Sequence, residues 1–352
     1  MPATLSLHSE LTNMSKKGVL LINLGTPDSP STADVRKYLN EFLMDPRVID
    51  VNPVLRTFLV KGLIVPFRSP KSAKLYREIW SDKTGSPLMH YSILQRDLLR
   101  ESLGDGYQVE LAMRYQSPSI QSVLDKFKEA LVDDILVIPL FPQYASASTG
   151  SVYDKVMEVI GTWPTKPNIS FINSFHDDDL MIATFADNAR KYKPETYDHI
   201  LFSFHGLPQR QLIKADHTHS HCLKAAGCCD TLTDVNKNCY SAQSHHTAKL
   251  IAAELGIPKE KYTICFQSRL GSDPWVQPYT SEVVAKLAAE GKKRVLVFCP
   301  AFVADCLETV YEVTVEYHEE FKAGGGEHMQ LVESLNDSPT FIKSLKRMVV
   351  GA

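Results

Sequence analysis

Short apolar runs alternate with longer amphipathic segments along nearly the whole chain. The apolar runs are rich in β-branched residues and almost continuous, which is typical of strands buried on both faces of a parallel sheet. The segments between them carry apolar residues at helical spacing. The predicted strands cover residues 18–25, 107–115, 134–141, 169–175, 199–206, 262–268, 294–302 and 329–335.

This alternation of strands and helices predicts an α/β fold with right-handed crossovers. The eight strands divide into two groups of four, and the proline-containing loop at 162–168, which precedes the fourth strand, places the boundary near residues 170–175. We therefore expect two domains, at 18–172 and 173–325, and a C-terminal segment at 326–352 that packs back on the first domain. One helix is predicted to start with Ser117 as its cap and Pro118 in its first turn, and another to run from Thr280 to Gly291.

Composition narrows the functional class. The chain has 352 residues, of which 44% are hydrophobic and 22% charged, and its net charge of −3 gives no reason to expect a nucleic-acid partner. No apolar run is long enough for a transmembrane helix, and the first 17 residues do not read as a secretion signal. We expect a cytoplasmic protein with reduced thiols. The sequence contains no GxGxxG or P-loop pattern, which argues against a nucleotide binder.

Ligands of open α/β sheets bind at the carboxyl ends of the strands, and two groups there stand out. His205 follows the apolar run 199–204, and Glu308, Glu312 and Glu316 follow the strand predicted at 294–302. Glutamates four residues apart share one face of an α-helix and repel one another, so a bound cation or proton would stabilise them. The alternatives are a turn histidine bonded to the backbone and a solvated acidic face.

Six segments also resemble, in order, the signature segments of ferrochelatases: "LLINLGTPDSP", "AMRYQSPSI", "LFPQYASASTGS", "LFSFHGLPQR", "CFQSRLGSDPWVQPYT" and "CPAFVADCLETVYE". The resemblance extends from residue 18 to about residue 340. It implies an enzyme, a lyase, that inserts Fe²⁺ into protoporphyrin IX with release of two protons, the terminal step of haem synthesis. It also implies two similar Rossmann-like domains with the porphyrin between them, and a lid at about 50–80.

Roles carry over from the family residue by residue. The resemblance implies that His205 and Glu308 face one another across the porphyrin, where they take up protons or deliver iron, and that Glu312 and Glu316 form a proton or metal path. Some family members have a histidine where this chain has Cys306, so any role of that histidine does not transfer. The positions that match the porphyrin pocket are Leu24, Arg114, Tyr115, Ser268, Trp275, Phe302 and Asp305.

The lid holds an apolar run within residues 57–80 whose basic flanks suit an anionic membrane surface. A lid that packs only on porphyrin and protein is the alternative. Two other functions also stay open: a coproporphyrin ferrochelatase, and a haem or metal carrier without turnover. The sequence does not predict an oligomeric state. The basic residues of the lid are Arg56, Lys61, Arg68, Lys71 and Lys74.

Four of the seven cysteines lie in the stretch 221–239, "HCLKAAGCCDTLTDVNKNC". Their thiolates could hold a [2Fe–2S] cluster or Zn²⁺, or stay free. An adjacent pair is awkward around one tetrahedral ion, whereas a two-iron cluster can take one thiolate on each iron. Several ferrochelatases carry a [2Fe–2S] cluster with ligands at other positions. The resemblance therefore suggests a cluster loop at about 216–240 with Cys222, Cys228, Cys229 and Cys239 as ligands, and with histidines 217, 219 and 221 as substitutes.

Overall fold

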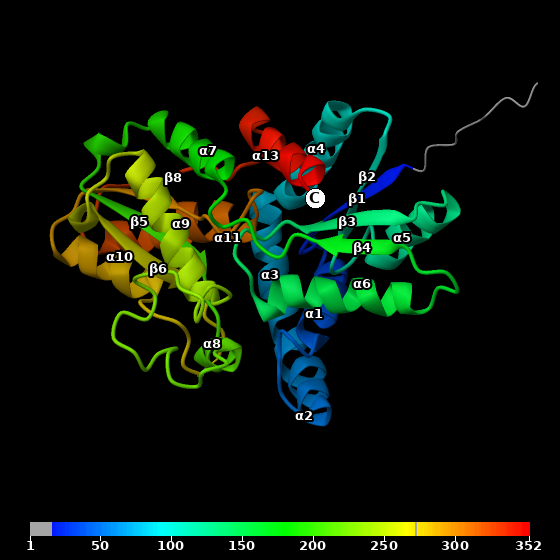
Figure 1. The fold of residues 1–352 in the computed structure, drawn as a ribbon. Helices are drawn as coiled ribbons and strands as arrows, with labels where there is room; N and C mark the ends of the chain where they lie inside the picture. Colours follow the sequence, from blue (N-terminus) through cyan, green and yellow to red (C-terminus); the bar gives the residue numbers. More distant parts are fainter. Residues whose placement is uncertain (1–15, 272) are drawn as a thin grey trace, which may run out of the picture.

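Two four-stranded parallel sheets form the centre of the computed structural model (Figure 1), which describes residues 16–271 and 273–352. The N-terminal stretch expected to lack a secretion signal falls mostly outside these residues. The strand orders are β2-β1-β3-β4 and β6-β5-β7-β8, so both sheets have the same topology. The predicted α/β class and the four-plus-four division are confirmed. The strands are β1 Lys17–Asn23, β2 Tyr107–Met113, β3 Asp134–Pro139, β4 Asn168–Phe171, β5 His199–His205, β6 Tyr262–Gln267, β7 Arg294–Phe298 and β8 His328–Leu331.

Helices cover both faces of each sheet. In the first half they are α1 Thr32–Met44, α2 Pro53–Thr57, α3 Val65–Ile79, α4 Pro87–Leu103, α5 Ile120–Glu129 and α6 Ser151–Gly161, with π-helical turns at Phe58–Ile64 and Ser146–Gly150. In the second half they are α7 Asp179–Arg190, α8 Gln209–Ala215, α9 Tyr240–Glu254, α10 Thr280–Ala289, α11 Leu307–Val310, α12 His318–Ala323 and α13 Pro339–Val350, with a π-helical turn at Glu312–Tyr317 and 3₁₀ turns at Pro194–Thr196 and Lys259–Lys261. No helix of the described residues is both long and apolar enough to cross a bilayer.

One predicted helix start was wrong. Helix α5 is capped by Ser119, whose hydroxyl accepts a hydrogen bond from the Ser122 amide, and not by Ser117. The reason is that the Pro118 carbonyl still accepts a hydrogen bond from the Met113 amide at 2.7 Å, so this residue continues the pairing at the end of β2. The other predicted helix is confirmed as α10, which starts at Thr280 and is followed by Gly291 with a φ of +80°.

The core explains why the strands are apolar on both faces. Alternate residues of a strand point to opposite faces, so Leu20 and Ile22 of β1 pack with α5 and α6, whereas Val19 and Leu21 belong to a second cluster. That second cluster also contains Phe202 of β5 and residues from α4, α7, α9 and α13. The two halves therefore share one continuous apolar core.

Candidate active site

His205 is the last residue of β5, at the carboxyl end of the second sheet. Its backbone carbonyl accepts a hydrogen bond of 2.8 Å from the Tyr240 hydroxyl of α9. The Phe302 ring lies edge-on to the imidazole, with ring centroids 6.3 Å apart. The half-buried imidazole is thus held at the edge of the sheet where parallel α/β folds bind their ligands.

Glu308 lies in α11 near His205, and a buried polar network fixes the chain just before it. The Asp305 carboxylate accepts hydrogen bonds from the Thr309 hydroxyl at 3.0 Å and from the Asn336 side chain at 2.7 Å. The Thr309 hydroxyl also accepts a hydrogen bond from the Cys306 amide at 3.0 Å. Because these buried groups satisfy one another, the first turn of α11 has a defined position.

The environment sets the protonation of His205. Burial lowers the pKa of His205, and the nearby Glu308 carboxylate acts in the opposite direction by favouring the charged ring. The effect of burial is the larger, so the imidazole is neutral at pH 7. A neutral imidazole has a free nitrogen lone pair, which can accept a proton or bind a metal ion.

Glu308, Glu312 and Glu316 form what we call the acidic row. Glu312, its central member, holds a proton near neutral pH. Burial, followed by the negative charge of Glu308, raises the pKa of Glu312 to about 8. The Ser268 hydroxyl and the Gln267 amide donate hydrogen bonds of 2.7 and 3.1 Å to the Glu312 side chain, which partly offsets this rise. Glu316 is exposed, so the row leads from the half-buried His205 and Glu308 towards solvent.

The expected single α-helical face for the three glutamates needs correction. Residues Glu312–Tyr317 form a π-helical turn between α11 and α12. The Glu316 amide donates to the Tyr311 carbonyl, five residues back, at 3.2 Å. Such turns are rare and occur frequently at functional sites. The row therefore runs along a wider turn than an α-helix would give.

Helices α1 and α3 bring two tyrosines, missed by the sequence analysis, close to Glu308. Burial raises the pKa of both Tyr38 and Tyr76, and the charge of Glu308 adds to the rise in each case. Leu307, beside Glu308, packs against the apolar cluster that contains both rings. Leu24 packs against the same cluster. The first half thus covers Glu308 with aromatic and aliphatic side chains. The sequence shows only that these side chains follow a helical periodicity, which does not distinguish them from the buried side chains of other helices.

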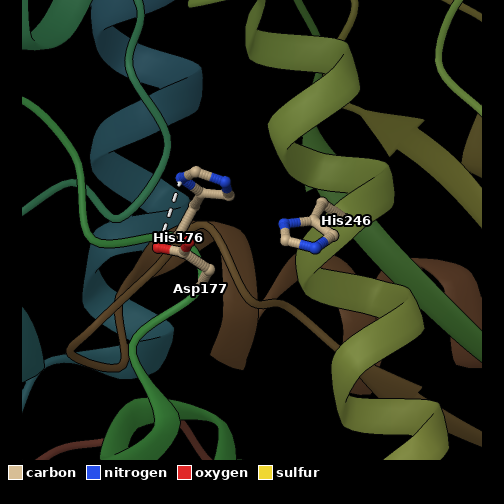
Figure 2. A group of neighbouring side chains, drawn as sticks. All are labelled: His176, Asp177 and His246. Atoms are coloured by element: carbon tan, nitrogen blue, oxygen red, sulfur yellow. Dashed lines mark ion pairs between the residues drawn. The ribbon is translucent and has the colours of Figure 1, made fainter. Parts of the chain in front are cut away.

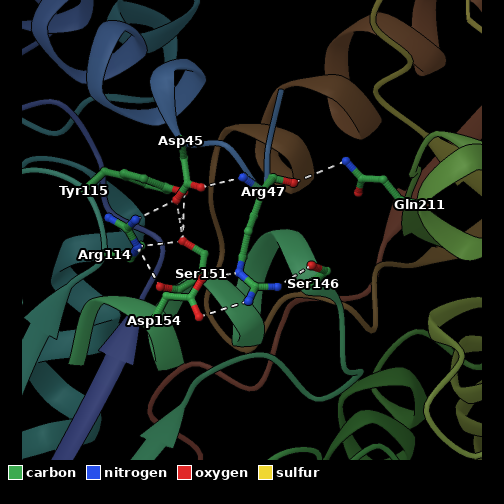
Figure 3. A network of polar contacts seen from close by, with 8 residues as sticks. All are labelled: Asp45, Arg47, Arg114, Tyr115, Ser146, Ser151, Asp154 and Gln211. Atoms are coloured by element: carbon green, nitrogen blue, oxygen red, sulfur yellow. Dashed lines mark hydrogen bonds and ion pairs between the residues drawn. The ribbon is translucent and has the colours of Figure 1, made fainter. Parts of the chain in front are cut away.

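Arg114 and Tyr115 belong to a polar network at the base of α1 (Figure 3). The Arg114 guanidinium donates to the Asp45 carboxylate at 2.6 Å, and the Tyr115 hydroxyl donates to the same carboxylate at 2.9 Å. The Ser151 hydroxyl completes this set, and Arg47 bridges Asp154 and Ser146 beside it. Tyr115 is fully buried, so the structure assigns both residues internal partners, and their contact with a porphyrin stays a prediction.

Trp275 packs directly on the turn that follows His205. A Cβ atom on Gly206 would lie 3.1 Å from the Trp275 ring and 2.8 Å from the Gln267 carbonyl, so only glycine fits without displacement. The Trp275 indole nitrogen is buried without a hydrogen-bond partner in the described structure. Two segments predicted to form the site, "HGLP" and "DPW", are therefore in contact, although they are some 70 residues apart.

The four cysteines predicted as cluster ligands gather in one loop between α8 and α9. The Sγ atoms of Cys228 and Cys229 are 3.8 Å apart, and the Cys239 thiol is within hydrogen-bonding reach of Cys222 and Cys229. Hydrogen bonds from these two thiols lower the pKa of Cys239. Among the described residues, no three of the four sulfur atoms all lie within 4.8 Å of one another. His221 instead pairs its Nε2 atom with the Cys228 carbonyl at 3.0 Å, which makes it a weaker candidate ligand.

The predicted lid carries an exposed apolar surface. Val54, Phe58 and Phe67 are 79%, 63% and 70% exposed, on α2, the following π-helical turn and α3. Figure 1 shows α2 at one extremity of the molecule. Asp50, just before this surface, forms salt bridges with Arg210 and Lys214 of α8, which tie the lid to the second half.

A family profile and similar sequences both identify one family. The profile of the family described as Ferrochelatase matches residues 16–352. The chain is 40% identical over 336 residues to a ferrochelatase of Coxiella burnetii (strain Dugway 5J108-111), covering 96% of this chain and 94% of the relative. It is 43% identical over 338 residues to a ferrochelatase of Opitutus terrae, covering 96% and 97%. A solved structure, SirB from Bacillus subtilis with Fe³⁺, superposes with a TM-score of 0.49 at 12% identity, covering 95% of this chain and 94% of SirB.

Proposed function

This chain belongs to the ferrochelatase family, and we propose that it inserts ferrous iron into protoporphyrin IX at the pair formed by His205 and Glu308. The observation that carries this proposal is the neutral imidazole of His205 at the carboxyl end of β5, close to a carboxylate that a buried network holds in place. This pair offers one proton acceptor and one anionic group to a reaction that needs both.

The reaction exchanges two protons for one metal ion. Two pyrrole N–H bonds break, the two electron pairs bind Fe²⁺, and no oxidation state changes. His205 accepts pyrrole protons through its free lone pair, and Glu308 favours the imidazolium that forms. Glu312 and Glu316 then pass protons outwards, or iron inwards, along the row that ends at solvent. The raised pKa of Glu312 suits a relay, because its carboxyl group gains and loses a proton near pH 8.

The walls of the site suit a flat apolar ring. Leu24, Trp275 and Phe302 supply apolar surface, and we expect the Arg114 guanidinium to interact with a propionate. Tyr38 and Tyr76 lie close to Glu308 and add aromatic surface from the first half. Coproporphyrin, which carries two more carboxylates, is the alternative substrate.

Anaerobic insertion assays with ferrous iron test the site. His205→Ala should bind porphyrin, as measured by fluorescence, but lose about 10²–10⁴-fold in turnover. His199→Ala is a matched control, because His199 lies at the other end of β5 and bonds to Thr263. Wild-type protein that binds porphyrin without turnover would instead identify a carrier. Preferred turnover of coproporphyrin over protoporphyrin would change the substrate assignment.

A second proposal is that the cysteine loop holds a [2Fe–2S] cluster through Cys222, Cys228, Cys229 and Cys239. The sulfur atoms of Cys228 and Cys229 are 3.8 Å apart, and Cys239 is within hydrogen-bonding reach of Cys222 and Cys229, so all four thiols lie close enough together to suit a two-iron cluster. A separation of 3.8 Å is that of two ligands on one tetrahedral ion with bonds of about 2.3 Å, so the adjacent cysteines can share one iron. This pairing differs from the sequence argument, which allotted them one iron each. The cluster would supply one-electron chemistry that metal insertion itself does not use.

Metal analysis of anaerobically purified protein tests the cluster. We expect a red-brown chain with about two irons and two sulfides. Cys228→Ser should lose the colour and lower stability, because binding energy in such loops contributes to folding. Cys265→Ser, a buried core thiol of β6, should keep the colour. A colourless wild type with one zinc ion per chain contradicts the proposal.

A third proposal places the lid on the inner face of the cytoplasmic membrane. Its support is the exposed apolar surface of Val54, Phe58 and Phe67 beside Lys61 and Lys71, a composition that suits anionic headgroups. Co-sedimentation should then be stronger with anionic than with neutral vesicles, and Phe58→Ser with Phe67→Ser should abolish the difference. Leu131→Ser removes an equally exposed apolar side chain elsewhere and should have no effect. Equal binding to both vesicle types contradicts the proposal.

A further inference from the structure

A further group of side chains that could hold a metal ion lies outside both the His205–Glu308 site and the cysteine loop. His176 and Asp177 belong to the loop between β4 and α7, and His246 comes from α9 (Figure 2). Each residue offers one ligand atom, and these atoms all lie within 4.8 Å of one another. The two imidazole rings are neighbours, with centroids 5.4 Å apart and ring planes tilted by 55°. The group brings together residues 70 positions apart in the sequence.

Both imidazoles carry a buried nitrogen atom without a partner. His176 is only 6% exposed, and its Nε2 atom has no hydrogen-bond partner in the described structure. The Nδ1 atom of His246 is also buried and unpaired. A buried polar atom left unsatisfied costs about 1–3 kcal/mol, so two of them in one place need an explanation. A single ion bound between the rings would satisfy both.

The surroundings fix this group in place. The Thr247 hydroxyl, next to His246, donates a hydrogen bond of 2.6 Å to the His176 carbonyl. The Gln143 side chain donates to the Thr247 hydroxyl at 3.0 Å, which ties α9 to the loop after β3. The Nδ1 atom of His176 lies 3.9 Å from the Asp177 carboxylate. The Asp177 carboxylate is therefore close enough to share an ion with the two imidazoles.

We propose that His176, His246 and Asp177 bind a divalent transition-metal ion of the zinc and ferrous iron class. Two imidazoles and one carboxylate form a donor set that such ions favour. Asp177 is exposed, so the ion can enter from solvent and keep open coordination positions for water. The bound ion joins the linker between the two halves to α9 of the second half. Because it binds the folded chain, it stabilises the fold increasingly as the free ion concentration rises above its Kd.

Metal binding to the intact chain, without porphyrin, tests this proposal. Equilibrium dialysis with Zn²⁺ and titration with Co²⁺ count the ions per chain, and the visible Co²⁺ spectrum reports imidazole and carboxylate ligation. His176→Gln and His246→Gln should each bind one ion fewer than wild type, with His205 and the cysteine loop left intact. Asp177→Asn should weaken this ion about 10–100-fold. His245→Gln is the matched control, because this ring, one residue away on α9, packs on Phe266.

Thermal unfolding separates a lost site from a lost fold. Zn²⁺ should raise the Tm of wild type and His245→Gln more than that of His176→Gln or His246→Gln, while all four unfold cooperatively in EDTA. If one histidine variant fails to fold, the other and Asp177→Asn still report on the site. Equal ion counts and equal Tm shifts in wild type and in the folded variants would overturn the proposal. That outcome would leave the proposed porphyrin chemistry unaffected, because neither readout measures metal insertion.

Discussion

At the scale of single residues, the environment decides the chemistry of Glu312. The same residue type at Glu316 and Glu320 lies exposed on the same segment. Glu312 instead lies against Ser268 and Gln267, where burial and the charge of Glu308 raise its pKa to about 8. The spacing of the row was visible in the sequence, but the protonation of its central member was not.

The raised pKa of Glu312 predicts a pH dependence of stability. The unfolded chain ionises this carboxyl group near its ordinary value of 4.5, whereas the folded chain resists ionisation until about pH 8. Its contribution to stability is therefore fully present below pH 4.5 and is lost as pH rises through 8. Glu312→Gln cannot ionise, so its Tm relative to wild type should rise between pH 6 and pH 9.

Thermal unfolding across this pH range checks the prediction for Glu312. The control is Glu320→Gln, which removes an exposed carboxyl group of α12. A difference in Tm between Glu312→Gln and wild type that does not change with pH would contradict it. Metal insertion by the same variant should fall about tenfold or more if Glu312 relays protons.

At the scale of elements, α11 is a short helix that side-chain hydrogen bonds hold in position. It spans only Leu307–Val310, too few residues for an isolated helix to form in water. Its position depends on Asp305 and Thr309, which bond to each other, and on Asn336 from the segment after β8. The sequence analysis expected Asp305 only as a pocket residue, and the structure adds this supporting role.

Removing one hydroxyl group should loosen this element. Thr309→Val preserves the shape but leaves the Cys306 amide without its side-chain partner, with a loss of about 1–3 kcal/mol in the free energy of unfolding. Turnover should fall as Glu308 loses its fixed position, with little change in porphyrin affinity. Thr314→Val is the control, because this exposed threonine bonds only within its own turn. Urea denaturation measures the free energy of unfolding, and steady-state assays measure turnover. Equal values of both in Thr309→Val and Thr314→Val would show that these hydrogen bonds do not hold α11 in place.

At the scale of the whole molecule, the two halves are joined by packing and by buried hydrogen bonds. Helix α13 packs with α4 and α7 in the shared core, so the end of the chain returns to the first half (Figure 1). Gln95 of α4 is fully buried and donates hydrogen bonds to the carbonyls of Val303 and Asn336, at 3.0 and 2.8 Å. Val303 lies in the loop that carries Asp305, and Asn336 donates a hydrogen bond to Asp305.

The shared core predicts that the halves unfold together. We expect one cooperative transition in urea, monitored by fluorescence and circular dichroism. Gln95→Leu leaves two buried carbonyls without this donor and should lower the free energy of unfolding by about 1–3 kcal/mol. Gln121→Leu, on the exposed face of α5, should change it by less than about 0.5 kcal/mol. Two separate transitions would show that the halves fold independently.

The sequence by itself determined the elements and much of the candidate chemistry. Apolar runs of the right length fixed eight strands in two groups, because a strand buried on both faces needs apolar residues at nearly every position. The sequence also indicated His205, the acidic row and the four cysteines, because chemically reactive residue types occur there close together or at the end of a strand. The predicted cap of α5 was wrong. Ser117 and Ser119 offer the same hydroxyl group, and only the hydrogen bond from the Met113 amide to the Pro118 carbonyl shows that the helix starts after Ser119.

Only the tertiary structure decided which distant residues meet. The approach of Tyr38 and Tyr76 to Glu308 and the meeting of His176 with His246 depend on how helices from different parts of the chain pack. The pKa of Glu312 depends in the same way on Ser268 and Gln267, which come from a distant part of the chain. Local patterns record the periodicity of an element, whereas contacts, burial and charge interactions arise only when the elements are brought together.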